Sequence, residues 1–143
     1  MTDGYNLALL VGAGLSMIAA LAHLAVIIGG PSWYRLFGAG EKLARAAEAG
    51  RLYPAIITIC IALVLMVWAA YALSGAGMIQ PLPFLRLALC AITFIYLARA
   101  MAGPLVLAGT GRNRRFITVS SLICLGFGLV HLVGLIQVWD RLG

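Results

Sequence analysis

The chain has 143 residues, of which 64% are hydrophobic and only 10% are charged, with a mean hydropathy of +1.07. Soluble domains average roughly 45–50% apolar and about 25% charged residues, so this composition argues against a soluble enzyme, a disordered segment or a nucleic-acid-binding module. Ten Lys and Arg against four Asp and Glu give a net charge of +6, which in so apolar a chain indicates membrane topology rather than phosphate binding.

The first candidate span covers residues 5–28, within a stretch from Gly4 to Tyr34 that contains no charged residue. Charged side chains are expensive in hydrocarbon, so charge-free runs longer than roughly 18 residues predict transmembrane helices, and the chain is long enough for about four. The residues before this span include Asp3 and no basic residue, and the apolar run is long for a signal peptide. We therefore expect a retained span.

The connection at residues 31–51 is the longest segment predicted to lie outside the membrane. Its first part is rich in aromatic residues, which is typical of a segment that lies in the membrane interface. Gly38 and Gly40 are expected to interrupt it. Glu41 and Arg45 then stand four residues apart, which predicts a short interfacial helix that ends at Gly50.

Three further spans are predicted at residues 53–73, 83–102 and 116–139. The span at residues 53–73 contains no charged residue. The span at residues 83–102 carries Arg86 and Arg99 and is expected to end at Gly103 and Pro104. Each is long enough to cross the hydrocarbon core. The predicted fold class is all-α: a polytopic membrane protein with an up-and-down bundle of four transmembrane helices, in a single domain at residues 1–143.

Basic residues are distributed unequally between the two ends of this predicted bundle. The first and third connections lie at one end, and the other end has only Arg86 and Arg141. Because basic residues are enriched on the cytoplasmic side of a membrane protein, we expect a multi-pass protein of the cell inner membrane with both termini non-cytoplasmic. The seven residues at the predicted cytoplasmic end are Arg35, Lys42, Arg45, Arg51, Arg112, Arg114 and Arg115.

Two spans carry small residues at every fourth position, followed by a histidine. At 100° per residue each set lies on one helix face, and small residues let helices approach closely in lipid. We therefore expect two helix-packing faces, with both histidines directed into the bundle. The similarity fits either an internal repeat or convergent packing. The sets are Gly12, Ser16 and Ala20 before His23, and Ser120, Cys124 and Gly128 before His131.

Arg99 is the residue with the highest expected free-energy cost of insertion into the membrane. An arginine at the middle of a span costs about 2.5–3.5 kcal/mol on insertion scales. Arg99, Tyr96 and His23 are predicted to lie at a similar depth, where they form a candidate ligand-binding pocket that opens toward the cytoplasm. Such a pocket suits an anionic head group or a quinone-like carbonyl. The alternative is that Arg99 reaches toward lipid phosphate, or toward Glu41 or Glu48.

A second, weaker polar cluster is expected in the outer half of the bundle. Its members are Trp68, Tyr71 and His131. Arg86 lies near the outer end of the third span, where Asp3 or Asp140 is a candidate ion-pair partner. Such a pair would hold the outer ends of the helices together.

No metal site or cofactor is expected. His23 and His131 are predicted to lie several helical turns apart in depth, which is too far for one metal ion or for a shared haem. The cysteines form no CxxC pair, which argues against a disulfide relay. They are Cys60, Cys90 and Cys124, one in each of the last three spans.

All four carboxylates fall outside the spans or at their ends: Asp3, Glu41, Glu48 and Asp140. Proton-coupled transporters usually need an acid within the membrane, and the small multidrug-resistance exporters carry a glutamate in their first helix. In length, basic charge and number of spans the chain resembles the MAPEG glutathione-dependent enzymes. Residues 51–54, which open the second span, lack the Asn and Glu of the set that binds glutathione in that family.

No catalytic residue is predicted, because the serines have no identifiable His and acid partners and no carboxylates are paired. We expect a small non-catalytic inner-membrane protein or accessory subunit, which packs against a membrane-protein partner or a second copy of itself, or binds a lipophilic ligand. We expect it to contact membrane lipids and to bind no nucleic acid. Two alternatives stay open: a membrane enzyme that acts on a lipid or quinone through the cytoplasmic-side pocket, and a small transporter or channel.

Overall fold

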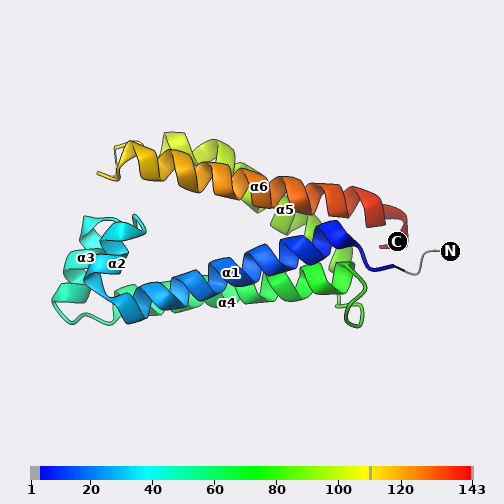
Figure 1. The fold of residues 1–143 in the computed structure, drawn as a ribbon, viewed down its shortest axis with the longest axis horizontal. Helices are drawn as coiled ribbons and strands as arrows, with labels where there is room; N and C mark the ends of the chain where they lie inside the picture. Colours follow the sequence, from blue (N-terminus) through cyan, green and yellow to red (C-terminus); the bar gives the residue numbers. More distant parts are fainter. Residues whose placement is uncertain (1–3, 110, 143) are drawn as a thin grey trace.

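The computed structural model describes residues 4–109 and 111–142, and its regular elements there are all helices. Two short helices, α2 (Pro31–Leu36) and α3 (Glu41–Glu48), lie in the first connection, and a 3-10 turn, η1 (Trp139–Arg141), follows the last helix. Four helices are long and apolar enough to cross a membrane, so the predicted all-α fold class is confirmed. They are α1 (Leu7–Gly29), α4 (Tyr53–Gly75), α5 (Leu85–Val106) and α6 (Arg114–Val138) (Figure 1).

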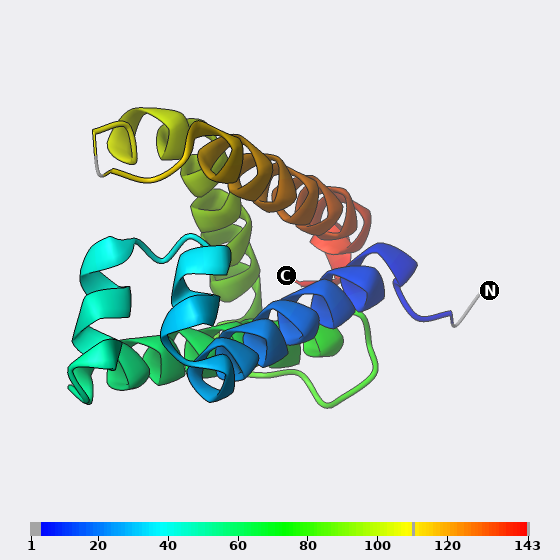
Figure 2. The same cartoon turned by 60° about the vertical axis from the view of Figure 1, so that its left-hand side comes forward.

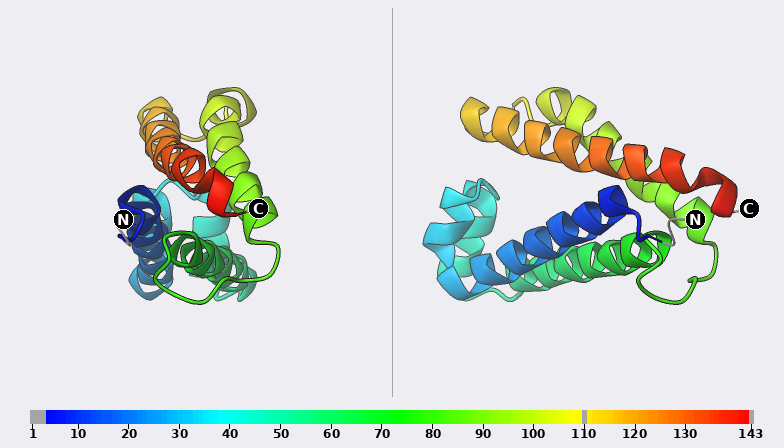
Figure 3. Two further views of the ribbon diagram at one scale, coloured as in Figure 1. Left: turned by 90° about the vertical axis from the view of Figure 1, so that its right-hand side faces the viewer. Right: turned by 45° about the vertical axis from the view of Figure 1, so that its right-hand side comes forward.

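The four long helices form two antiparallel hairpins. Helix α1 packs along α4, α5 packs along α6, and the two hairpins meet mainly where α1 contacts α6. The hairpins are close together at the end of the molecule that holds both termini, and they diverge toward the end that holds α2 and α3 (Figures 2 and 3). The connection between α5 and α6 lies at this second end, so all seven basic residues of the first and third connections lie there (Figure 1).

Most buried positions on each long helix are three, four or seven residues apart, which is the spacing that keeps one face of a helix toward its neighbours. The remaining faces carry many exposed large apolar side chains, as expected for helices that meet lipid on the outside of a bundle. On α6 the buried positions are Ile117, Ser121, Gly128, His131, Gly134, Leu135 and Val138.

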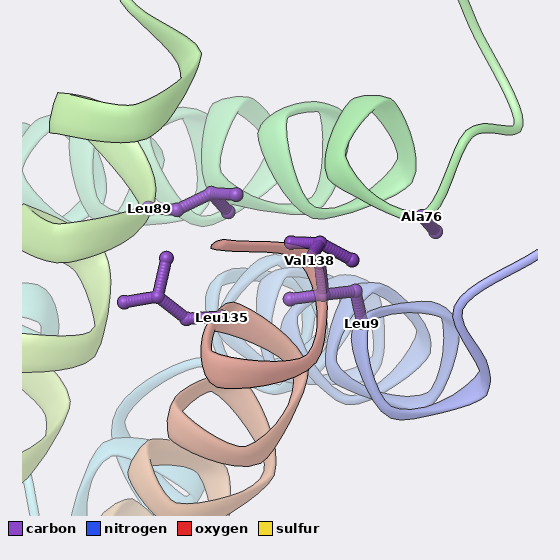
Figure 4. Close-up of a cluster of buried hydrophobic side chains, with 5 residues drawn as sticks. All are labelled: Leu9, Ala76, Leu89, Leu135 and Val138. Carbon is purple, nitrogen blue, oxygen red and sulfur yellow. The ribbon is translucent and has the colours of Figure 1, made fainter. Parts of the chain in front are cut away.

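An apolar cluster closes the bundle where the hairpins meet (Figure 4). Its buried members come from α1, α5, α6 and the residue after α4. Leu9 enters the cluster because glycines make room for it: a Cβ at Gly75 would lie 2.9 Å from one Leu9 methyl carbon, and a Cβ at Gly134 would lie 2.8 Å from the other. The cluster consists of Leu9, Ala76, Leu89, Leu135 and Val138.

The start of α1 is tied to this end of the bundle by Asn6. Its side-chain oxygen accepts a 2.8 Å hydrogen bond from the N–H of Leu9, so Asn6 caps the helix. Its amide nitrogen donates to Oε1 of Gln137 at 2.8 Å, and its backbone N–H donates to the carbonyl of Ala76 at 3.0 Å. One residue thereby joins α1, α4 and α6.

Helix α5 runs past its predicted end. The predicted span stops at residue 102, whereas the helix continues through Pro104 to Val106. Proline removes one backbone donor and its ring crowds the preceding turn, but only part of one turn follows it here. Helical bonding resumes after it, since the N–H of Leu107 donates to the carbonyl of Gly103 at 3.0 Å. The other long helices begin and end within two residues of the predicted spans.

Helices α2 and α3 pack back onto α1 and α4. Tyr34 of α2 is buried with Val26 of α1 and Ala44 of α3, and its hydroxyl lies 3.2 Å from Oγ1 of Thr58 in α4. Gly38 and Gly40 have positive φ angles and separate the two short helices at the predicted position. The short helix expected between residues 41 and 50 is therefore present as α3, and its place at the membrane interface stays a prediction.

The connection between α2 and α3 also contacts the second hairpin. Gly38 lies so close to Phe116 of α6 that a Cβ on the glycine would collide with the phenyl ring. Nη2 of Arg112 donates to the carbonyl of Ala39 at 3.0 Å. These contacts bridge the two hairpins at the end where they diverge.

Candidate ligand-binding site

Tyr96 of α5 is the centre of a buried cluster in the middle of the bundle. Its hydroxyl lies 2.9 Å from Oγ of Ser16 in α1, which is itself fully buried. Its ring stacks edge-on against Trp68 with centroids 4.9 Å apart and against Phe127 at 5.4 Å, and it tilts toward His131 at 5.2 Å. The cluster joins all four long helices through one side chain.

His131 is fully buried beside this cluster. Its Nδ1 donates a 2.8 Å hydrogen bond to the carbonyl of Phe127, one turn earlier in α6. In the neutral ring Nε2 is then an acceptor, and it has no hydrogen-bond partner among the described residues. Gly12 of α1 packs directly on the imidazole, because a Cβ there would lie 2.8 Å from Cε1. The expected inward direction of His131 is confirmed.

Arg99 and Ser121 place two unpartnered polar atoms at the interface of α5 and α6. Nη1 of Arg99 and Oγ of Ser121 are buried and have no hydrogen-bond partner among the described residues. Both atoms lie over Gly103, where an added Cβ would collide with each of them. A buried donor without a partner, above all a charged one, is costly. This pair is the candidate ligand-binding site.

The two residues belong to inner turns of α5 and α6, and their polar atoms meet at Gly103, three positions before the end of α5. Arg99 precedes the last residue of α5 by seven positions, and Ser121 follows the first residue of α6 by seven, which at 1.5 Å per residue is about 10 Å from the helix ends. Three ion pairs lie within the described residues, and none involves Arg99. A guanidinium with these surroundings is suited to a ligand group that accepts hydrogen bonds or carries negative charge.

The residues of the first predicted pocket have different partners. Tyr96 contacts Trp68 and His131, two members of the second predicted cluster, and the described hydrogen bonds and ring contacts do not join it to Arg99. His23 is half-buried, and its Nδ1 donates to the carbonyl of Ala19 in its own helix at 2.7 Å. A shared pocket of His23, Tyr96 and Arg99 stays a prediction.

The second predicted cluster is brought together in part. Trp68 and His131 both contact the ring of Tyr96. The hydroxyl of Tyr71 instead donates to the carbonyl of Pro83, at the end of the α4–α5 connection, at 3.2 Å. Tyr71 thus anchors a connection rather than adding a polar group to the bundle interior.

The predicted packing faces differ in how well they match the buried surface. Gly12, Ser16 and Ala20 are all buried on α1. On α6 Gly128 is buried against Leu97, whereas Ser120 and Cys124 are only half-buried. Ser121, which the four-residue pattern does not include, is buried, and Ser120 is not. A repeat of seven residues that includes Ser121, Gly128 and Leu135 would have identified it.

Glu41 and Glu48 have cationic partners other than Arg99, so the alternative that Arg99 pairs with them is wrong. Arg35 binds Glu41 at 2.9 Å and Glu48 at 2.7 Å, and Arg45 binds Glu41 at 3.1 Å. Hydrogen bonds from Arg35 and then Arg45 lower the pKa of Glu41 to about 2. Arg35 likewise lowers the pKa of Glu48, and the two carboxylates raise the pKa of Arg35.

Arg86 contacts an aromatic ring rather than a carboxylate among the described residues. Its Cζ lies 3.8 Å from the centre of the Trp139 ring, which is a cation–π contact. No described ion pair joins Arg86 to Asp140, so that expected pair is not formed. The alternative partner, Asp3, lies outside the described residues.

The described residues contain no group of three or more His, Cys, Asp or Glu side chains placed to hold a metal ion. The three cysteines are free thiols. Comparisons of the chain with models of protein families, with curated proteins and with solved structures find no match.

Proposed function

We propose that this chain is a non-catalytic integral membrane protein that binds a lipophilic ligand, whose polar head contacts Arg99 and Ser121 between α5 and α6. The observation that carries the proposal is the pair of buried, unpartnered polar atoms over Gly103. An acceptor group placed between them would satisfy both donors. It would also offset the cost of a cation within the membrane, which is highest when no partner is present.

The chemistry of the two donors limits the head group. A guanidinium and a hydroxyl both donate hydrogen bonds to a phosphate, a carboxylate or a quinone carbonyl. The outer surfaces of α5 and α6 are apolar, with side chains such as Phe94, Leu122 and Ile123 exposed. A ligand with a polar head and an apolar tail therefore matches both the donors and the surface beside them.

The arrangement of the helices favours ligand binding over association through the small-residue faces. Gly12 packs on His131, Ser16 bonds to Tyr96, and Gly128 packs on Leu97. The predicted face of α1 and Gly128 of the predicted face of α6 are thus used inside the bundle. The apolar cluster around Leu9 and Leu89, both fully buried, favours ligand binding over a channel, because a hydrated path would have to pass through it.

We further propose that the protein lies in a cell inner membrane with α2 and α3 in the cytoplasm and both termini on the other side. The support is the concentration of basic residues at the end that holds α2, α3 and the α5–α6 connection. The cluster Arg112, Arg114 and Arg115 would then face the anionic lipids of the cytoplasmic leaflet.

Native mass spectrometry of the protein in mild detergent tests the ligand proposal. Phosphatidylglycerol and decylubiquinone are added separately as probes to the wild type, Arg99→Gln and Ser121→Ala. We expect the wild type to retain one of the probes, and Arg99→Gln to retain it at least tenfold less, because the charged donor is lost. Ser121→Ala should show a smaller loss. The probe that is retained identifies the head-group chemistry.

Arg114→Gln is the matched control, because it also removes one arginine but lies at the exposed start of α6. It should bind the probe as the wild type does. Thermal unfolding of each variant separates loss of binding from loss of fold. Equal retention by the wild type and Arg99→Gln would contradict the proposal, as would a wild-type protein that retains neither probe.

A further inference from the structure

A cavity of about 920 Å³ lies at the end of the bundle that holds both termini. It is open on one side and is lined by the segment before α1, the end of α4, the connection between α4 and α5, the first turns of α5, and η1. This end is opposite to the one nearest Arg99 and Ser121. Its volume is in the range of about 300–1,000 Å³ that is typical of small-molecule sites.

Hydrogen bonds from α4 fix one wall of this cavity. Oγ of Ser74 donates to the carbonyl of Gln80 and accepts from the N–H of Leu82, both at 3.0 Å. The hydroxyl of Tyr71 donates to the carbonyl of Pro83 at 3.2 Å. The connection is thereby tied to α4 at three points, so the cavity is formed before any ligand enters.

The cavity combines positive charge with an apolar lining. Among the described residues that line it, the charged ones are Arg86 and Arg141, and most of the others are apolar. Arg86 is held in place by the ring of Trp139, 3.8 Å from its Cζ. A cation–π contact uses the face of the guanidinium and leaves its N–H edges free to donate to an anion.

Two of the residues that line the cavity are apolar and exposed. Phe84 is 81% exposed and Leu87 is 68% exposed, and both line the cavity. Phe84 also has a φ of 55°, in the left-handed region that is unfavourable for a bulky residue. Strained conformations of this kind cluster at ligand-binding sites.

We propose that this cavity binds an amphiphile with a carboxylate or phosphate head, which Arg86 and Arg141 hold while the apolar tail leaves past Phe84 and Leu87. The head lies at the level of the membrane interface, because Arg86 is the second residue of α5. The tail extends toward the hydrocarbon. This site is independent of the one at Arg99 and Ser121, since the two share no residue.

Fluorescence of Trp139 gives a direct test, because this ring lines the cavity. The chain has three tryptophans, so Trp33→Phe with Trp68→Phe leaves Trp139 as the sole emitter. The probes are a fatty acid with a bromine on its chain, its methyl ester, and a phosphatidylglycerol with brominated chains. We expect saturable quenching by at least one anionic probe, with the ester at least tenfold weaker than the acid.

The variants decide whether the arginines hold the head. Arg141→Gln should weaken saturable quenching at least fivefold, and Arg86→Gln should weaken it further. Arg51→Gln, which lies exposed at the opposite end, should leave it unchanged. Because Arg86 touches Trp139, retention of the unlabelled fatty acid is also measured by native mass spectrometry. Equal quenching by acid and ester would overturn the proposal, as would unchanged binding in both arginine variants.

Discussion

One close contact between the two hairpins depends on a residue without a side chain. Gly12 of α1 faces the imidazole of His131 in α6, and there is no room for a Cβ between them. In lipid the hydrophobic effect does not drive helices together, so close van der Waals packing and hydrogen bonds do. Gly12 allows both, because it brings α1 near enough for Ser16 to reach the hydroxyl of Tyr96.

Replacing Gly12 by alanine should destabilise the bundle. The added Cβ would lie 2.8 Å from Cε1 of His131, and the ring that would have to shift is fully buried. Overpacking of this kind costs about 1–3 kcal/mol. We expect the unfolding midpoint of Gly12→Ala in a denaturing-detergent titration to fall below that of the wild type.

Gly14→Ala is the control for this prediction, since a Cβ at Gly14 meets nothing within 4 Å. It should be neutral or stabilising by up to about 1 kcal/mol, because alanine favours a helix over glycine. If the two variants unfolded at the same midpoint, the assigned contact between Gly12 and His131 would be wrong.

For individual residues, the sequence predicted the buried face of α1 better than the buried face of α6. Positions four residues apart shift slowly around a helix. Three residues at this spacing therefore predict the buried face well over two turns and less well over longer stretches. This shift explains why the four-residue pattern on α6 includes the buried Gly128 but includes Ser120 in place of the buried Ser121. Hydropathy cannot choose between two adjacent serines.

Helices α2 and α3 are held together by charges as well as by Tyr34. Arg35 of α2 binds both Glu41 and Glu48, which lie at the two ends of α3. All three side chains are exposed, so salt screens these interactions and none is individually strong. Together they fix the direction of α3 relative to α2.

Acid should loosen α3 from α2. The pKa of Glu41 is lowered from its ordinary value of 4.5 to about 2, and that of Glu48 is also lowered. A carboxylate with a lowered pKa contributes stability fully above its unfolded value, and this contribution is lost as the pH falls through the folded value. We expect the emission of Trp33, with the other two tryptophans replaced by Phe, to stay constant from pH 7 to about 5 and to change between about 4.5 and 2.

Glu41→Gln provides the comparison, because it removes the carboxylate that both arginines contact. Its Trp33 emission at pH 7 should already be shifted toward the acid-state value, and the remaining change on acidification should be smaller. An identical pH profile in wild type and Glu41→Gln would show that these ion pairs do not hold α3.

Gly38→Ala should detach the α2–α3 connection from α6. Gly38 has a φ of 66°, and an added Cβ would collide with the ring of Phe116. Gly50→Ala is a matched control, since Gly50 has a φ of 69° and a Cβ there meets nothing within 4 Å. Both variants strain the backbone, but only the first displaces a neighbour. We expect faster proteolysis within residues 31–50 in Gly38→Ala than in Gly50→Ala, and equal rates would contradict the contact.

The elements themselves were the most predictable part of the molecule. Charge-free runs located three of the four long helices, because a charged group inside a span has a clear energetic cost, and the apolar run that contains Arg86 and Arg99 located α5. The end of α5 was less predictable, because a proline near a helix end removes little bonding and does not have to stop the helix. Gly38 and Gly40 marked the break between α2 and α3 correctly.

The pairing of helices into hairpins is a property of the whole molecule, and hydropathy does not predict which helices pair. A helix face that meets lipid and one that meets another helix are both apolar, so composition does not separate them. For the same reason the sequence did not predict that the ring of Tyr96 packs against Trp68, Phe127 and His131. These contacts depend on the packing of α5 against α1, α4 and α6, which the sequence pattern does not predict.

The two ends of the molecule differ in charge, and this asymmetry predicts its orientation. Seven basic residues lie at the end with α2 and α3, and Arg86 and Arg141 lie at the end with the termini. We expect alkaline phosphatase fused after the C-terminus of the full chain to be active and green fluorescent protein fused there to be dark, because both report a non-cytoplasmic position. Fusions after residue 50 should give the opposite pair of results. A fluorescent C-terminal fusion with inactive phosphatase would instead place the termini in the cytoplasm, and the basic end would then face away from it, against the rule that orients most membrane proteins.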